Sequence, residues 1–206
     1  MGSALFLLLA LAACGAGDSS NGEQQSSQHG ADARIATHSK GNAPSMLGNT
    51  TIAGISFTPA SHWKNLEASG MRQAQYRLPP VGEDTAEGEV NIYYFGPQSG
   101  GGVEANLQRW VGQMTLPEGT NPATAIQKST FTADGMAGHV VALNGSYKSG
   151  GGRPMGGSTQ LLPGYRLVGV VLEGPEGSLF FKLTGPLATA EIMEIELMKM
   201  VKKATQ

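Results

Sequence analysis

The sequence predicts an α+β domain in which one central and one C-terminal helix pack on an antiparallel β-sheet. Segments with the alternation and β-branched composition of strands come in pairs separated by short turns, which is the pattern of hairpins. Two other segments, 103–114 and 187–203, have apolar residues at the spacing of one helix face. Glycine is frequent, with 30 residues, and charged residues make up only 15% of the chain, which favours a turn-rich sheet over a helical bundle.

The first half of the domain supplies three predicted strands. Residues 51–58 have the β-branched and aromatic composition of a strand, and Trp63 follows as an expected core residue. Residues 71–78 alternate along the chain, and residues 90–95 form a second clear strand. The acidic stretch 82–88 between these two strands is therefore interpreted as the loop of a hairpin.

The next segment changes from the period of a strand to that of a helix. Its apolar residues are spaced to form one stripe, which consists of Val103, Leu107, Trp110, Val111 and Met114. Trp110 is therefore expected to pack against the sheet, whereas Arg109 points away from the stripe. Pro117 prevents the helix from continuing further.

The second half of the domain contains four further predicted strands. Residues 126–132 and 136–147 flank an Ala-Asp-Gly turn, which predicts a hairpin. A glycine-rich loop at 149–158 then leads to residues 165–172 and 179–183, which are expected to pair across a second tight turn.

The last predicted element is a helix over residues 187–203. Its expected buried stripe consists of Ala190, Met193, Leu197, Met200 and Val201. Glutamates come early in this segment and lysines late, as the helix dipole favours. Hairpins interrupted by one helix and followed by another predict an antiparallel sheet with helices packed on it, and the βα repetition of a Rossmann fold is absent from the sequence.

The amino terminus carries an export pattern. Residues 4–13 form an uninterrupted apolar run that is shorter than the ~20 residues of a membrane-spanning helix. The run ends in Leu11-Ala12-Ala13-Cys14, which resembles the lipobox of bacterial lipoproteins. The resemblance implies a diacylglyceryl group on the Cys14 thiol, cleavage just before Cys14, and acylation of the new amino group. An ordinary cleaved signal peptide followed by an incidental cysteine is the alternative.

The chain is therefore expected to have three parts. Residues 1–13 are the predicted signal peptide, residues 14–48 the lipidated cysteine and a disordered linker, and residues 49–206 a single α+β domain. The linker prediction rests on a Gly, Ser, Gln and Asn composition that buries too little apolar surface to offset the entropy cost of ordering. The expected partners are a bacterial membrane, through the lipid on Cys14, and an envelope protein. The domain is expected outside the cytoplasm, on the inner or the outer membrane.

Composition excludes several classes of function. Lysine and arginine total 14 against 16 acidic residues, and no basic block stands out, so the sequence carries no electrostatic footprint for nucleic acid. Cys14 is the only cysteine, which rules out an intramolecular disulfide and a zinc site built on several thiolates.

The sequence contains no pattern that predicts catalytic, cofactor-binding or metal-binding residues. His62 and His139 lie outside any zinc motif, and no Gly-x-Ser-x-Gly element of a serine hydrolase is present. His139 is interpreted as a sheet-facing histidine with a satisfied hydrogen bond. The glycines at 100–102 are interpreted as a tight turn and the segment 150–158 as a surface loop, because both lack the spacing and the lysine of phosphate-binding loops.

Four carboxylates could in principle hold a hard cation such as Ca²⁺. These are Glu83, Asp84, Glu87 and Glu89, and their order does not fit the twelve-residue calcium loop. They are interpreted as the solvated tip of a hairpin.

The order of elements and a few short strings resemble a known fold. The string Phe-Thr-Pro at 57–59 followed by Trp63, the Arg-Trp pair at 109–110, the late hairpin and the C-terminal helix together resemble the PsbP/Mog1-like fold. The segment 180–186 is similar to a family of uncharacterised bacterial secreted proteins. The resemblance covers most of residues 51–201. Members of this fold bind proteins rather than catalyse reactions, so the resemblance implies a binding module, although a fold alone does not fix a function.

Three hypotheses for the function follow. The first is a lipid-anchored, non-enzymatic interaction or assembly module at the cell envelope. The second is an envelope enzyme of hydrolase type whose site is assembled from scattered residues such as His139, Arg109 and Arg153. The third is a carrier of an apolar ligand between sheet and helices, suggested by the nine methionines, for which core packing is the simpler explanation.

Overall fold

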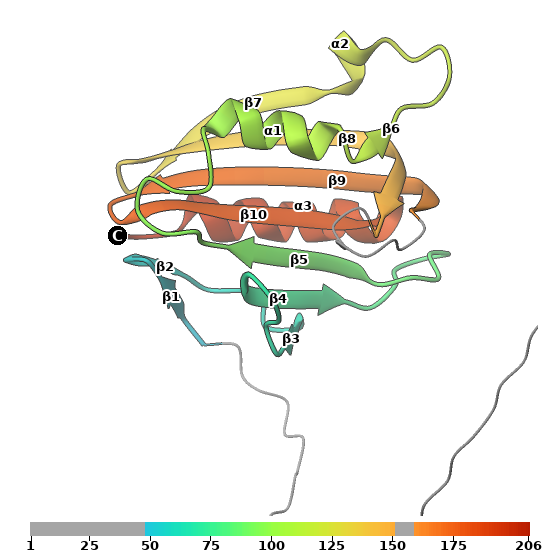
Figure 1. The fold of residues 1–206 in the computed structure, drawn as a ribbon. Helices are drawn as coiled ribbons and strands as arrows, with labels where there is room; N and C mark the ends of the chain where they lie inside the picture. The colour runs from blue at the N-terminus through green and yellow to red at the C-terminus, as the bar shows by residue number, and fades with distance from the viewer. Residues whose placement is uncertain (1–47, 151–158) are drawn as a thin grey trace, which may run out of the picture. The chain divides into compact units, whose positions relative to one another are not determined.

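The α+β prediction is confirmed by a computed structural model of the chain, which describes residues 48–150 and 159–206 (Figure 1). An eight-stranded antiparallel sheet carries one helix on each face, and a separate two-stranded sheet lies beside it. The elements are β1 (Thr50–Ile52), β2 (Ile55–Phe57), β3 (Lys64–Leu66), β4 (Arg72–Leu78), β5 (Gly88–Tyr93), α1 (Val103–Val111), β6 (Met114–Thr115), α2 (Pro122–Ala125), β7 (Gln127–Ala133), β8 (Met136–Ser149), β9 (Gln160–Gly174), β10 (Gly177–Pro186) and α3 (Leu187–Lys202).

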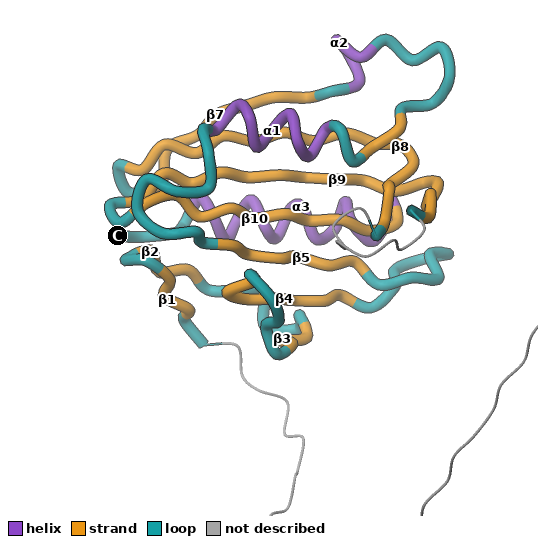
Figure 2. Tube along the Cα trace, in the orientation of Figure 1, coloured by secondary structure: helices purple, strands orange, loops and turns teal. Residues whose placement is uncertain are grey.

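The strands of the large sheet follow the order β3-β4-β5-β10-β9-β8-β6, and β7 also pairs with β8 (Figure 2). Three hairpins predicted from the sequence, β4–β5, β7–β8 and β9–β10, are confirmed. The order also places the β4–β5 hairpin next to the last strand, because Tyr93 of β5 pairs with Phe180 of β10. The N-terminal and C-terminal parts of the domain are thus joined through the middle of the sheet.

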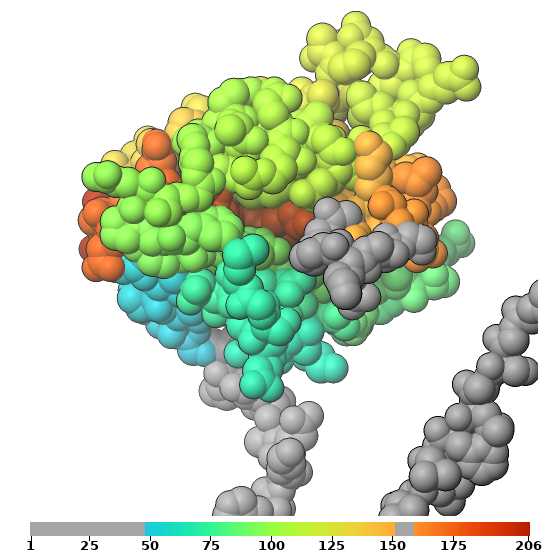
Figure 3. All heavy atoms as spheres, in the orientation of Figure 1, coloured from blue at the N-terminus to red at the C-terminus, as the bar shows by residue number. Residues whose placement is uncertain are grey.

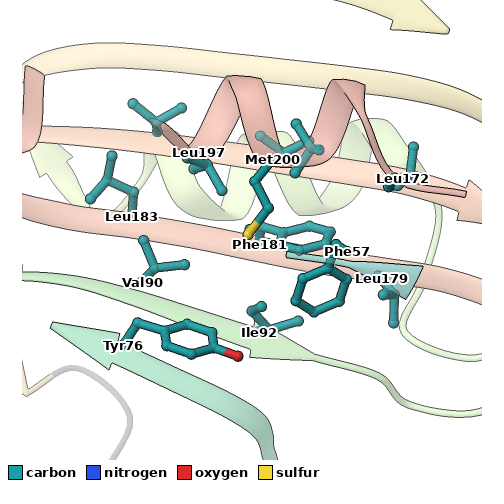
Figure 4. Close-up of a cluster of buried hydrophobic side chains, with 14 of the residues drawn as sticks. Phe57, Tyr76, Val90, Ile92, Leu172, Leu179, Phe181, Leu183, Leu197 and Met200 are labelled. Carbon is teal, nitrogen blue, oxygen red and sulfur yellow. The ribbon is translucent and has the colours of Figure 1, made fainter. Parts of the chain in front are cut away.

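The face of the sheet under α3 forms the larger hydrophobic core. The expected stripe of α3 is buried there, and Trp63 is also buried, at 2% exposure. Figure 4 shows Phe57 against Phe181 near Met200 of α3, with Tyr76 on the other side of Ile92 in the same core. Three of the methionines, Met136, Met193 and Met200, are buried in this core, where they fill gaps as core methionines do, whereas Met71 is exposed.

The opposite face carries α1, which packs over β8 and β9. Its residues Leu107 and Trp110 are buried against Val141, Leu143 and Leu167, as the stripe predicted. The helix expected to reach Met114 nevertheless ends at Val111, because Gly112 terminates it and Met114 joins β8 as a short strand. Met114 is nevertheless buried in this short strand.

The prediction of a single first strand is wrong. The residues expected as one strand at 51–58 form two strands, β1 and β2, joined by a tight turn at Ala53 and Gly54 with φ values of 48° and 73°. Both central residues have positive φ, as a type I′ turn requires. Alanine is uncommon at such a position, so the sequence did not indicate a turn there. The short β3 and α2 were also not predicted, although Pro122 after Asn121 is a good helix start.

Asp84 fastens the start of α3 to the loop between β4 and β5. The helix follows Pro186, whose ring cannot cap it, and instead the Asp84 carboxylate accepts hydrogen bonds from the Thr189 N–H and hydroxyl, both at 2.7 Å. A carboxylate at this end also interacts favourably with the helix dipole. None of the helices within the described ranges is long and apolar enough to cross a membrane.

Candidate functional site

Of the residues proposed from the sequence as a scattered catalytic set, His139 and Arg109 are described, and each bonds to a different neighbour. His139 bonds to Glu173 at 3.1 Å, which confirms its interpretation as a sheet-facing histidine with a hydrogen bond. Arg109 is exposed and donates to Asn106 at 2.9 Å. No hydrogen bond or ion pair among the described residues joins Arg109 with His139. Arg153 lies outside the described residues, as do Cys14 and the predicted signal peptide.

The glycines at 100–102 form a tight turn around a buried side chain. The Asn106 amide donates to the carbonyl oxygens of Gly100, Gly101 and Gly102 at 2.8, 3.3 and 3.0 Å. Gly100 has a φ of 92°, and a Cβ at this position would lie 2.8 Å from the Phe180 ring. The turn interpretation is confirmed, because both the backbone conformation and the close approach require glycine.

The four carboxylates of the β4–β5 hairpin do not converge. Asp84 caps α3, and Glu87 and Glu89 bond instead to the guanidinium of Arg77 at 3.1 and 3.4 Å. Within the described ranges, no group of three or more His, Cys, Asp or Glu residues is placed to hold a metal ion.

The open depressions on the described surface include two larger ones. One of about 670 Å³ lies between the segment after β2 and the end of α3, with Lys199 and Lys203 on its wall. The other, of about 430 Å³, lies between α1 and β7 and includes His139. The charged side chains around His139 already pair with one another, since Lys128 binds Glu104 at 2.7 Å.

A third region, on the α1 side of β5 and β10, combines polar groups with burial. We call it the Lys182 cluster, and it consists of Glu89, Asn91, Gln113, Tyr147 and Lys182. Asn91 of β5 and Lys182 of β10 are direct cross-strand partners at its centre. Figure 3 shows the surface hollowed between α1 and β4, with red atoms of the C-terminal part of the chain at the floor.

Strand alternation places these polar residues opposite the main core. Val90 and Ile92 point into the core under α3, so Asn91 between them points to the other face. Phe181 and Leu183 do the same on either side of Lys182. Around this pair the two central strands are apolar on the α3 face and polar on the α1 face, whereas Phe180 and Tyr93, further along the same strands, belong to the apolar cluster under α1.

Gly169 determines how much of this face α1 covers. The Trp110 indole lies directly on Gly169 of β9, where a Cβ would be 2.0 Å from the ring. Gly169 is the cross-strand neighbour of Lys182, so α1 sits over β9 and β8 and stops short of β10. The polar residues of β5 and β10 consequently lie beside the helix rather than beneath it.

Lys182 is held by neutral groups. Its ammonium donates to Gln113 Oε1 at 3.0 Å and to the Tyr147 hydroxyl at 3.1 Å, and it lies 5.3 Å from the centroid of the Tyr147 ring. No carboxylate of the described residues lies within ion-pair distance of it. The positive charge is thus partly buried and has no counter-ion among these residues.

The side-chain oxygen of Asn91 has no hydrogen-bond partner among the described residues. Its side chain is 3% exposed, and its N–H donates to the Glu89 carboxylate, but its carbonyl Oδ1 is buried and accepts no bond from the described residues. A buried acceptor without a donor is costly and uncommon in folded proteins. A ligand donor that displaces the groups covering this oxygen would supply the bond it lacks.

The aromatic residues beside the cluster extend its wall. Tyr147 and Tyr165 stack with their centroids 6.1 Å apart and their planes 13° apart. Burial, followed by the charge of Asp84 and the neighbouring Tyr147, raises the pKa of Tyr165 above its ordinary value. Tyr165 therefore stays protonated and neutral at physiological pH.

Sequence reasoning missed this cluster, although one local signal was present. A charged residue within the otherwise apolar run 179–183, and an amide between Val90 and Ile92, mark polar side chains on strands that should be buried on both faces. Only the pairing of β5 with β10 brings the two signals together.

Neither a scan against protein-family models nor a search of curated proteins finds a match for this chain.

Proposed function

We propose that this chain is a lipid-anchored, non-enzymatic binding module of the bacterial cell envelope. The observation that carries the binding role is the Lys182 cluster, where a partly buried ammonium without a counter-ion and a buried, unpartnered amide oxygen belong to cross-strand partners on the same face of the sheet. A few polar groups of this kind fix the orientation of a ligand in a binding site.

The arrangement of side chains favours binding over hydrolysis. Both histidines of the described ranges bond to carboxylates, His62 to Glu196 at 3.2 Å and His139 to Glu173. Among the residues described, no hydroxyl shares a hydrogen bond with either histidine, whereas an activated serine or threonine needs such a base. Lys182 and Tyr147 form a polar contact that orients a ligand without supplying a nucleophile paired to a base.

The membrane anchor in this proposal rests on the sequence around Cys14. The apolar run that ends in Leu11-Ala12-Ala13-Cys14 supports lipidation, and the composition of residues 15–48 supports a linker between the lipid and the domain. A flexible linker of this length would hold the domain about 30 Å from the membrane surface.

Metabolic labelling tests the anchor. Growth with labelled palmitate is expected to label the wild-type chain, and Cys14→Ser is expected to abolish labelling and release the protein from the membrane fraction. A wild-type chain that is bound to membranes but carries no label would refute lipidation at Cys14.

Native mass spectrometry tests the binding role without assuming a ligand. The wild-type chain, purified gently from membranes, is expected to carry a species that is recovered chemically unchanged after denaturation. Lys182→Met should lose that species, while Lys199→Met, an exposed lysine on the opposite side of the domain, should retain it. Recovery of a chemically altered product, or equal retention by all three chains, would count against a non-enzymatic module that binds through Lys182.

A further inference from the structure

We propose that the Lys182 cluster binds a ligand in which a carboxylate is next to an N–H donor, as in a free α-amino acid or at the carboxyl terminus of a peptide. This inference rests on the binding role proposed above and adds the chemical class of the ligand. It does not depend on the lipid anchor.

The carboxylate is inferred from the surroundings of Lys182. An ammonium has three N–H donors, and the described residues accept from it at Gln113 and Tyr147 only. A partly buried charge held by neutral groups gains more from an incoming anion than an exposed lysine does, because the local dielectric constant is lower. The Tyr147 hydroxyl accepts from Lys182, so its own proton remains free to donate to the same anion.

The N–H donor is inferred from Asn91. The Asn91 amide cannot be reversed, because its Oδ1 would then face the Glu89 carboxylate and two acceptors would meet. Oδ1 therefore remains the buried acceptor, and only a group with a proton to donate satisfies it. A simple anion without a donor would leave this oxygen unpaired.

The pairing of the two residues across adjacent strands favours a compact ligand. Asn91 and Lys182 are directly opposite each other, and such residues have Cα atoms about 4.5–5.5 Å apart in an antiparallel pair. In an amino acid or at a peptide terminus, the carboxylate and the N–H are attached to one carbon atom, so a single small group reaches both.

Titration of the purified full chain with matched small molecules tests the ligand class. N-acetyl-L-alanine supplies a carboxylate with an amide N–H, and L-alanine supplies a carboxylate with an ammonium. N-acetyl-L-alaninamide lacks the carboxylate, and sulfate lacks the donor. We expect one or both carboxylate probes to bind, by calorimetry or by shifts of amide signals in β5 and β10, at least about tenfold more tightly than either control. Tighter binding of L-alanine would identify a free amino acid, and tighter binding of the acetylated probe a chain terminus.

Two variants and one control assign the binding to named atoms. Lys182→Met and Asn91→Leu should each weaken the preferred probe about tenfold or more, while Lys199→Met should leave its affinity unchanged. Circular dichroism checks that each variant is folded, and the comparison of acid with amide on the wild-type chain requires no variant. The inference is overturned if neither carboxylate probe binds, if the amide binds as well as the acid, or if Lys182→Met binds normally. A wild-type chain that carries a Lys182-dependent species but ignores these probes would refute the ligand class and leave the binding role standing.

Discussion

Gly169→Ala is the substitution that most directly tests how α1 is seated on the sheet. The added methyl carbon would lie 2.0, 2.5 and 2.8 Å from three carbon atoms of the Trp110 ring. Gly169 does not have a positive φ, so alanine creates no backbone strain there. The whole effect of the substitution therefore comes from the overlap with the indole, which is rigid and held by its helix.

The size of the effect follows from packing. Forcing one extra methyl group into a filled core costs about 1–3 kcal/mol, and the short distances at Gly169 place this substitution in the upper part of that range. Removing the indole with Trp110→Ala costs about 3–5 kcal/mol, because Trp110 is only 6% exposed. In the double variant, the new methyl group enters the space that the indole vacated, so the two costs should not add. We expect Gly169→Ala to cost less than about 0.5 kcal/mol when Trp110 is absent.

Urea unfolding of the full chain, followed by far-ultraviolet circular dichroism, measures these free energies without relying on tryptophan fluorescence. Gly102→Ala is the matched control, because a Cβ at that position meets no atom within 4 Å, and it should change stability by less than about 0.5 kcal/mol. If Gly169→Ala is harmless in the wild-type background, or costs the same with and without Trp110, the indole does not rest on Gly169. The contact between Trp110 and Gly169 would then not explain why α1 leaves the polar face of β5 and β10 uncovered.

Three further predictions concern stability. Asp84→Ala removes the carboxylate that bonds to Thr189 and should lower the free energy of unfolding by about 1–2 kcal/mol in urea titrations, whereas its exposed neighbour Glu83→Ala should have almost no effect. Burial raises the pKa of Tyr76 in the folded protein, so the unfolded chain loses its phenolic proton first; stability is therefore unaffected well below pH 10.0 and falls as the pH rises above it. Tyr76→Phe should flatten that alkaline fall when the free energy of unfolding is measured from about pH 9 to 11, and an unchanged slope would show that another group causes it. A chain that begins at Gly48 should unfold at the same urea concentration as the full chain, and a lower midpoint would show that the preceding residues contribute to the fold.

Much of the fold was predictable because most of its helices and strands have a recognisable local sequence pattern. The stripe of Leu107 and Trp110 and the alternation within residues 136–147 and 165–172 reflect burial on one side of an element, which requires a fixed spacing in the sequence. The β1–β2 hairpin was missed because its turn uses Ala53 in a conformation that favours glycine or asparagine. A search for asparagine or glycine at that position therefore does not detect the turn.

The Lys182 cluster was beyond local prediction for a different reason. Its parts come from β5, β10, the end of α1 and the far part of β8, and each part is ordinary when taken alone. The face of the sheet on which Asn91 lies, and its partner Lys182, follow only from the register of β5 against β10. A shift of one residue would turn Asn91 into the core. The Asn91 Oδ1 atom lacks a donor also because Glu89 accepts from the amide N–H and so holds the amide in one orientation.

The pairing of β5 with β10 has a consequence for the order in which the domain can fold. The β4–β5 hairpin is made early in synthesis, and its only partner in the large sheet besides β3 is made near the end. Isolated hairpins are unstable in water, and contacts between distant residues form slowly. The N-terminal half should therefore stay open until the ribosome has released β10 and α3. On the export route proposed here, that delay would keep the nascent chain unfolded while it is threaded across the membrane.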